Sequence, residues 1–245
     1  MTNPRRPSRL RTILRSSAAR RSRRSVDSFL DRLRLRLDRM GLQGYQPNPL
    51  VDKGGERAGG TRTRWEQIAP LVADLKVASA LDVGCNSGWF TYKLADAGIA
   101  TIGVESDPPM ARTSIYVARR ARPRRMGLLF LHVDATTVDM LPEVDCVLFL
   151  SVWHHMVRDS GLATADGILA SLWGKARKVL VFDTGEAECT AEFHLPEMTP
   201  TPRVWLESQL AEVCTGAEIR NLGRHAAFAP DGTKCDRELI ALVRS

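Results

Sequence analysis

Short apolar runs alternate with helix-like segments over most of the chain after residue 60. The runs contain few polar residues, which is typical of strands that are buried on both faces of a parallel sheet. Between them, apolar residues recur three or four positions apart, the spacing of a helix face. This alternation predicts an α/β fold with helices on both faces of the sheet. The predicted strands are 77–83, 100–104, 127–133, 144–152 and 179–182, and the predicted helices are 61–76, 90–97, 109–122 and 162–175.

The end of the chain has a different pattern. A further helix is predicted over 202–213, and two strands follow at 218–222 and 238–243 around a segment with proline and glycine. We therefore predict a doubly wound seven-stranded sheet, mostly parallel, that ends in a hairpin and occupies residues 61–245.

The first 60 residues differ from this domain in charge and composition. Residues 1–40 hold 13 arginines and 3 aspartates, a net charge of +10, whereas the other residues carry −3. We expect residues 1–25 to be disordered, residues 26–40 to form a basic amphipathic helix, and the glycine-rich residues 41–60 to form a linker. The helix could dock on the domain or on a second copy in a homodimer, or it could contact an anionic membrane surface or RNA.

Composition restricts the cellular setting. No apolar stretch approaches the roughly 18 residues that a membrane span requires. The five cysteines are scattered and form no Cys-x-x-Cys pair, so we expect reduced thiols, no metal site and a cytoplasmic protein. Arginine outnumbers lysine 29 to 6, which suggests a bacterial genome rich in G and C, although the arginine- and serine-rich start also fits a transit peptide.

The densest chemical signal is a glycine turn between the first two predicted strands. Gly84 and Gly88 bracket the turn, and Glu105 ends the second strand 21 positions after Gly84. Glycines allow a ligand to approach the backbone, and an acid at this spacing can accept both ribose hydroxyls. This layout predicts a nucleoside site. A dinucleotide fingerprint would require glycine where Asn86 stands, which disfavours a dehydrogenase.

The segment Asp82-Val83-Gly84-Cys85-Asn86-Ser87-Gly88 resembles motif I of the class I S-adenosylmethionine-dependent methyltransferases. The resemblance covers about residues 61–245 and implies S-adenosyl-L-methionine as the cofactor. It implies as well that the terminal hairpin is antiparallel to the rest of the sheet, as the family's sixth and seventh strands are. It also implies that Asp134 and Ala135, after the third strand, contact the adenine, although Asp134 could instead cap the helix that follows. The candidate cofactor-binding residues are Asp82, Gly84, Cys85, Asn86, Gly88, Glu105, Asp134, Ala135 and Ser151.

The fourth predicted strand leads directly into His154 and His155. Ligands of open α/β sheets bind beyond the carboxyl ends of the strands, so this pair should enter the cleft. A histidine with a pKa near neutral suits removal of a proton from a hydroxyl acceptor. Because Trp153 and His155 would occupy alternate strand positions, we favour His155 as the base, with His154 as the other candidate. Both could instead only shape the pocket, and His194 and His225 are more remote candidates.

The sequence therefore predicts an O-methyltransferase that acts on a hydroxyl of a small molecule, sugar or glycan. Enzymes that methylate amino groups of nucleic acids usually carry Asn/Asp-Pro-Pro-Tyr/Phe after the fourth strand, and residues 151–154 differ from it. An RNA methyltransferase anchored by the arginine tail remains an alternative, as does a non-catalytic cofactor-binding subunit. Metal-assisted transfer would draw on strand-end residues Asp134, His154, His155, Asp183 and Glu186.

Overall fold

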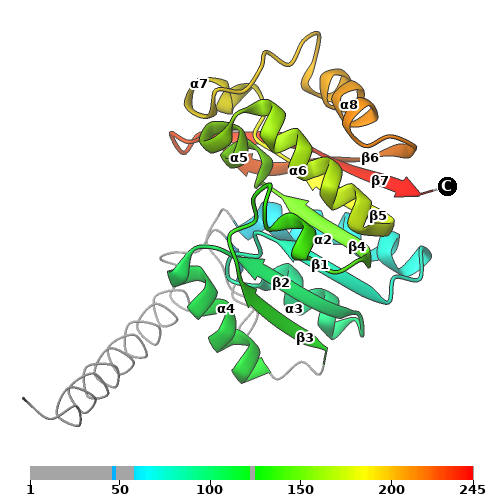
Figure 1. Ribbon diagram of the computed structural model, residues 1–245. Coiled ribbons are helices and arrows are strands. Elements are labelled where there is room, and N and C mark those ends of the chain that lie inside the picture. Colours follow the sequence, from blue (N-terminus) through cyan, green and yellow to red (C-terminus); the bar gives the residue numbers. More distant parts are fainter. Residues whose placement is uncertain (1–45, 48–57, 122–124, 245) are drawn as a thin grey trace, which may run out of the picture.

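The computed structural model describes residues 46–47, 58–121 and 125–244 (Figure 1). The predicted basic helix, the disordered start and most of the predicted linker lie outside the described residues. No helix in the described ranges is long and apolar enough to cross a membrane.

A single seven-stranded sheet has the order β3-β2-β1-β4-β5-β7-β6. The first five strands are parallel, and β7 is antiparallel to both β5 and β6. The predicted doubly wound, mostly parallel sheet with an antiparallel terminal hairpin is therefore confirmed. The strands are β1 Ser79–Val83, β2 Ala100–Glu105, β3 Met126–Phe130, β4 Val144–Leu150, β5 Ala176–Asp183, β6 Ala217–Phe228 and β7 Lys234–Arg244.

Helices cover both faces of the sheet and bury two separate apolar clusters (Figure 1). Alternate residues of one strand serve the two clusters: Phe149 of β4 belongs to the cluster that includes Trp153 and Leu169, and Leu148 belongs to the one that includes Trp89. The helices are α2 Ala58–Asp74, α3 Trp89–Asp96, α4 Pro108–Ala121, α5 Trp153–Ser160, α6 Leu162–Lys175, α7 Thr190–Phe193 and α8 Pro202–Val213, with short 3₁₀ turns η1 Val138–Met140 and η2 Ala187–Cys189.

The largest difference from the sequence prediction lies after β4. The strand stops at Leu150, because Ser151 adopts a left-handed conformation with φ of 57° that no strand continues. His154 and His155 therefore lie in the first turn of α5, which the apolar pattern did not predict. The argument from alternate strand positions was wrong, since residues two apart on a helix point in nearly opposite directions. Trp153 accordingly packs into the core at 1% exposure.

Candidate active site

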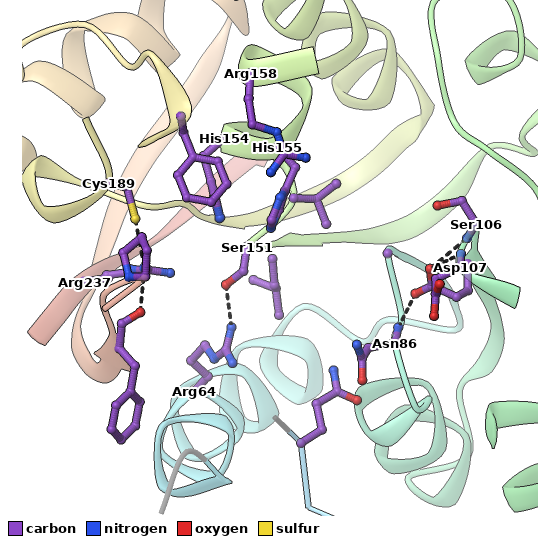
Figure 2. A pocket seen from close by; sticks show the side chains of 18 of the residues that line it. Arg64, Asn86, Ser106, Asp107, Ser151, His154, His155, Arg158, Cys189 and Arg237 are labelled. Atoms are coloured by element: carbon purple, nitrogen blue, oxygen red, sulfur yellow. Dashed lines mark hydrogen bonds between the residues drawn. The ribbon is translucent and has the colours of Figure 1, made fainter. Parts of the chain in front are cut away.

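The carboxyl ends of the strands open into a cavity of about 610 Å³. Its two ends are built differently, as Figure 2 shows. The glycine-loop end is lined by the turn after β1 and by residues 105–107, and the histidine end is lined by α5, α7 and the β6–β7 turn. A second cavity of about 130 Å³ adjoins the first, and the two share the lining residues Gly84, Ser106, Val152 and His155.

The turn after β1 requires glycine where it approaches its neighbours. Gly84 has φ of 73°, and a Cβ atom there would lie 2.4 Å from a methyl carbon of Val152. The amides of Gly84 and Cys85 both donate to the carbonyl of Val104 at 2.9 Å, which fastens the turn to β2. Gly88, with φ of 81°, then starts α3. The loop therefore lines the cavity with backbone at Gly84 and with the side chain of Asn86 (Figure 2).

Asp82 and Cys85 support this loop from beneath. The buried carboxylate of Asp82 accepts a hydrogen bond of 2.6 Å from the Thr91 hydroxyl, which ties β1 to α3, and burial raises its pKa to about 6. Burial also raises the pKa of the Cys85 thiol well above its usual value, so this cysteine is an unreactive packing group. Asp82 lines the larger cavity, and the direct cofactor contact that we expected for both residues stays a prediction.

Glu105 is held rigidly at the edge of the cavity. Its carboxylate accepts hydrogen bonds from the backbone amides of Asn86 at 2.7 Å and of Ser106 and Asp107 at 2.8 Å each. A carboxylate offers about four acceptor positions, so three amide bonds leave it able to accept from a ribose hydroxyl. The carboxylate thus joins the glycine loop to the end of β2 and faces the ligand space.

The smaller cavity has an apolar lining that suits a planar base. Asp134 and Ala135 do not line either cavity. The Asp134 carboxylate instead accepts from the Thr136 hydroxyl at 2.7 Å and from the amides of Thr136 and Thr137 at 2.8 and 2.9 Å, and these bonds, the hydroxyl first, lower its pKa to about 2. Asp134 therefore caps the turn before η1, the alternative raised from the sequence, and its contact with adenine stays a prediction. The apolar lining residues are Val83, Val104, Leu131, Val133, Val152 and Met156.

At the histidine end, the protonation of the His154 ring is fixed by the backbone. The Gly185 amide donates to His154 Nδ1 at 3.0 Å, so Nδ1 carries no proton and the neutral ring bears its proton on Nε2. The Thr184 hydroxyl lies 3.1 Å from the same nitrogen. Burial, with the neighbouring His155, lowers the pKa of His154 well below 6.5. His154 is therefore a neutral hydrogen-bond donor and a poor proton acceptor.

His155 is the more accessible of the pair and lines both cavities. The Phe193 ring lies edge-on to both histidines, at 4.8 Å from His154 and 4.9 Å from His155. The Arg158 guanidinium lies 5.3 Å from the same ring. Partial burial and the charge of Arg158 lower the pKa of His155, so its ring is neutral at physiological pH and can accept a proton.

A buried network around Asp183, the last residue of β5, supports the turn that leads to these histidines. Asp183 is fully buried and accepts hydrogen bonds from Arg64 Nη1 at 2.8 Å and from the Ser151 hydroxyl at 2.7 Å. His225 Nε2 lies 3.2 Å away. Although burial alone would raise the pKa of Asp183, Arg64 and the other donors hold it well below its usual range. Ser151 lines the cavity, but its hydroxyl serves this network, and a cofactor contact stays a prediction.

Several residues that line the larger cavity could not be predicted from the sequence, because they lie far apart along the chain. Arg237 of β7 lines the histidine end while Nε donates to Glu188 at 2.7 Å, and the Gln46 side chain accepts from the Ser87 hydroxyl at 3.0 Å. His194 lines neither cavity. The part of the chain that the structure describes holds no group of three or more His, Cys, Asp or Glu that could bind a metal. The carboxylates and histidines at the strand ends therefore do not form a metal site in this structure.

Comparisons with known proteins agree with this geometry. The profile of a family described as "Methyltransferase domain" matches residues 81–171. A tRNA U34 carboxymethyltransferase of Desulfotalea psychrophila is 26% identical over 126 residues, which are 49% of this chain and 37% of that protein. A protein of the same name from Shewanella piezotolerans is 29% identical over 93 residues, 38% and 28% of the two chains. The chain thus spans about a third of the length of these relatives.

Solved structures share the fold at low identity. Magnesium protoporphyrin IX methyltransferase from Synechocystis, with bound S-adenosylmethionine, is 20% identical with a TM-score of 0.57, over 77% of this chain and 81% of that one. The bifunctional kinase-methyltransferase WbdD is 19% identical with a TM-score of 0.60, over 74% and 39%. A second structure of the Synechocystis enzyme, with bound S-adenosylhomocysteine, has the same fold as this chain, with a TM-score of 0.56. Residues 81–171 thus match a methyltransferase domain, and the chain shares the fold of these solved methyltransferases.

Proposed function

We propose that the protein transfers a methyl group to a hydroxyl oxygen of a small molecule, sugar or glycan, with His155 as the general base. The observation that carries the proposal is the position of His155, whose neutral ring lies where the two cavities meet. A group that lines both cavities is within reach of ligands in each of them. Its neighbour His154 carries its proton on Nε2 and is unsuited to that role.

The residues of the glycine-loop end fit the cofactor. The backbone turn at Gly84, the carboxylate of Glu105 and the apolar smaller cavity suit the amino acid, ribose and adenine parts of the ligand respectively. S-adenosyl-L-methionine supplies a sulfonium methyl that a nucleophile displaces in line. The chain holds the acceptor in attacking geometry and excludes competing water at the histidine end.

In this proposal the proton follows a short route. His155 accepts the proton of the acceptor hydroxyl as the oxygen becomes nucleophilic, and the exposed edge of the ring then releases it to solvent. The Asp183 network holds Ser151 and thereby fixes where α5 begins. Phe193 packs against both imidazole rings and restricts their orientation. These contacts keep His155 in position between successive turnovers.

An RNA acceptor is the second candidate. It is supported by the names of the two relatives from Desulfotalea and Shewanella and by the charge of +10 on residues 1–40. Deletion of residues 1–40 should then abolish an RNA affinity that falls steeply with salt, while cofactor affinity remains. Equal RNA binding by the full-length and shortened proteins across a salt series would remove this role of the tail. We also propose a cytoplasmic location, which five free cysteines support, and leave a homodimer as a proposal.

The experiment that tests the main proposal uses cofactor with a ¹³C-labelled methyl group and separate pools of glycans, hydroxylated metabolites, lipids and RNA. We expect label to enter a glycan or small molecule, and the carbon chemical shift to be that of a methoxy group. A chemical shift typical of N-methyl or C-methyl products would overturn O-methylation. Label that enters only RNA would establish the second candidate instead.

A further inference from the structure

The histidine end of the cavity offers hydrogen-bond donors from His154 and Arg158, and the carboxylate of Glu192 also lines it. His154 donates through Nε2, because the Gly185 amide occupies Nδ1 at 3.0 Å. No described residue accepts a hydrogen bond from Nε2, although the ring lines the cavity and is only 4% exposed. Nε2 is not among the buried polar atoms that lack a partner, so it faces the cavity, and a ligand that presents an oxygen atom there would replace water as its acceptor.

Arg158 adds a charged donor beside it. Nε and Nη2 of Arg158 donate to the Asp159 carboxylate at 2.7 and 3.2 Å, and among the described residues Nη1 makes no hydrogen bond. Figure 2 shows the Arg158 side chain extending from α5 toward the two histidines. Contact with Phe193 limits where the guanidinium can lie. Two nitrogens of the Arg158 guanidinium therefore bind Asp159, and the residue also lines the cavity.

The ion pair between Arg158 and Asp159 is weak. The side chain of Asp159 is 58% exposed, and an ion pair exposed to this degree contributes little because water competes for both partners. By contrast, Arg237 is buried and tightly paired with Glu188 at 2.7 Å. An incoming anion can therefore take over the outward side of Arg158 at small cost, whereas Arg237 is committed to the protein.

We propose that the methyl acceptor carries an oxyanion, a carboxylate or a phosphoryl group, next to the hydroxyl that is methylated, and that His154 Nε2 and Arg158 Nη1 bind this oxyanion. The inference rests on the proposed function and narrows its substrate class. Charge-assisted bonds from a guanidinium to such groups are short and directional, so they orient the acceptor as well as hold it. The adjacent hydroxyl then faces His155.

Binding of an oxyanion at this site would also change the pKa of His155. Arg158 lowers the pKa of His155 in the free protein, and an oxyanion on Arg158 offsets that charge and strengthens His155 as a base. Acceptor binding would thus activate the residue that deprotonates it. The charged or titratable groups that face His155 are His154, Arg158 and Asp159 on α5, Glu192 on α7, His132 after β3, and Arg237 on β7.

The test follows the His155 ring protons by NMR as a function of pH, with and without S-adenosylhomocysteine. Sodium sulfate and sodium acetate serve as probes of the phosphoryl and carboxylate classes, and sodium chloride at matched ionic strength is the reference. We expect one of the two anions to raise the His155 pKa saturably, and the one that saturates at the lower concentration identifies the class. Arg158→Gln should weaken the saturable effect at least about tenfold.

Arg203→Gln is the matched control, because Arg203 is an exposed arginine on α8 that pairs with Glu207 at 2.9 Å and lines neither cavity, and this variant should respond like the parent. Overlap of the sulfate, acetate and chloride titrations, or an unchanged response in Arg158→Gln, would overturn the inference. The proposed function fails separately, through absence of S-adenosylhomocysteine binding by calorimetry or of methyl transfer. Since the anion titration is also run without that ligand, it reports on the oxyanion site in either case.

Discussion

The two ends of the cavity are built on opposite principles. The glycine-loop end comes largely from one continuous stretch, residues 82–107, whose turn is fastened to the Glu105 carboxylate through backbone amides. The histidine end is assembled from side chains that lie between Arg64 and Arg237 in the sequence. Backbone geometry is fixed by the fold, whereas side chains can be exchanged one at a time. We therefore propose that the first end binds the cofactor and that the second selects the acceptor.

The strongest test of this division is removal of the base. His155→Ala should lower turnover by about 100- to 10,000-fold, because a positioned general base contributes that much, while S-adenosylmethionine affinity changes little. Turnover is measured with saturating substrates, and cofactor affinity by calorimetry. Normal turnover with chemistry shown to be rate-limiting would mean that the base is elsewhere.

The dependence of the rate on pH provides a second test of His155→Ala. The base acts when neutral, so the rate should fall as pH drops through the pKa of His155 in the parent enzyme. Since burial and Arg158 lower that pKa, the acidic limb should lie below pH 6.5. His155→Ala should lose this limb, and a limb that persists unchanged would assign it to another group.

A stability test concerns the buried support of the histidine end. Asp183→Ala should reduce the free energy of unfolding by about 3–5 kcal/mol, because it leaves the Arg64 charge buried without its carboxylate. Urea unfolding measures the loss. Asp159→Ala is the control, since this carboxylate also pairs with an arginine but is exposed, and it should have almost no effect. Similar values for both variants would show that the Asp183 network contributes nothing beyond a surface pair.

At the glycine-loop end we expect a smaller effect. Glu105→Ala should weaken S-adenosylmethionine by about 1–3 kcal/mol, because both the ribose and the amides of Asn86, Ser106 and Asp107 lose a charged acceptor. Calorimetry gives the affinity, and turnover at saturating cofactor should be nearly unchanged. An unaltered dissociation constant would show that the carboxylate only shapes the loop and does not bind the ligand.

The same contrast explains what the sequence could predict. Strand, glycine turn and acid are local signals, so the succession of strands along the chain could be predicted from the sequence, whereas the role of the loop in cofactor binding stays a prediction. The end of β4 before Ser151 could not be predicted, because the apolar run continues to Val152 and serine has no preference for the left-handed conformation that Ser151 adopts. Likewise, the pairing of Arg64 with Asp183 joins residues 119 positions apart and follows only from the folded sheet.

The smallest expected effect concerns Asp82, which lies under the glycine loop. Its pKa is about 6 in the folded protein against 3.8 without the fold, so between about pH 4 and 6 the folded state binds more protons than the unfolded state. Stability should therefore fall as pH rises through this window and level off above it. Asp82→Asn keeps the shape of the side chain without the charge and should flatten that part of the curve.

The titration of Glu186 is common to the parent and the Asp82→Asn variant, so it serves as a reference in this experiment. Burial raises its pKa to about 7, so its own contribution continues to decline above pH 6 and should persist in the Asp82→Asn variant. The measurement is urea unfolding of parent and variant at a series of pH values between about 4 and 7. Parallel curves would show that Asp82 is ionised throughout and that its bond to Thr91 outweighs burial. A parent that gains stability relative to the variant as pH rises from 4 to 6 would contradict the sign argued here, because ionisation of Asp82 adds a loss of stability that the variant lacks.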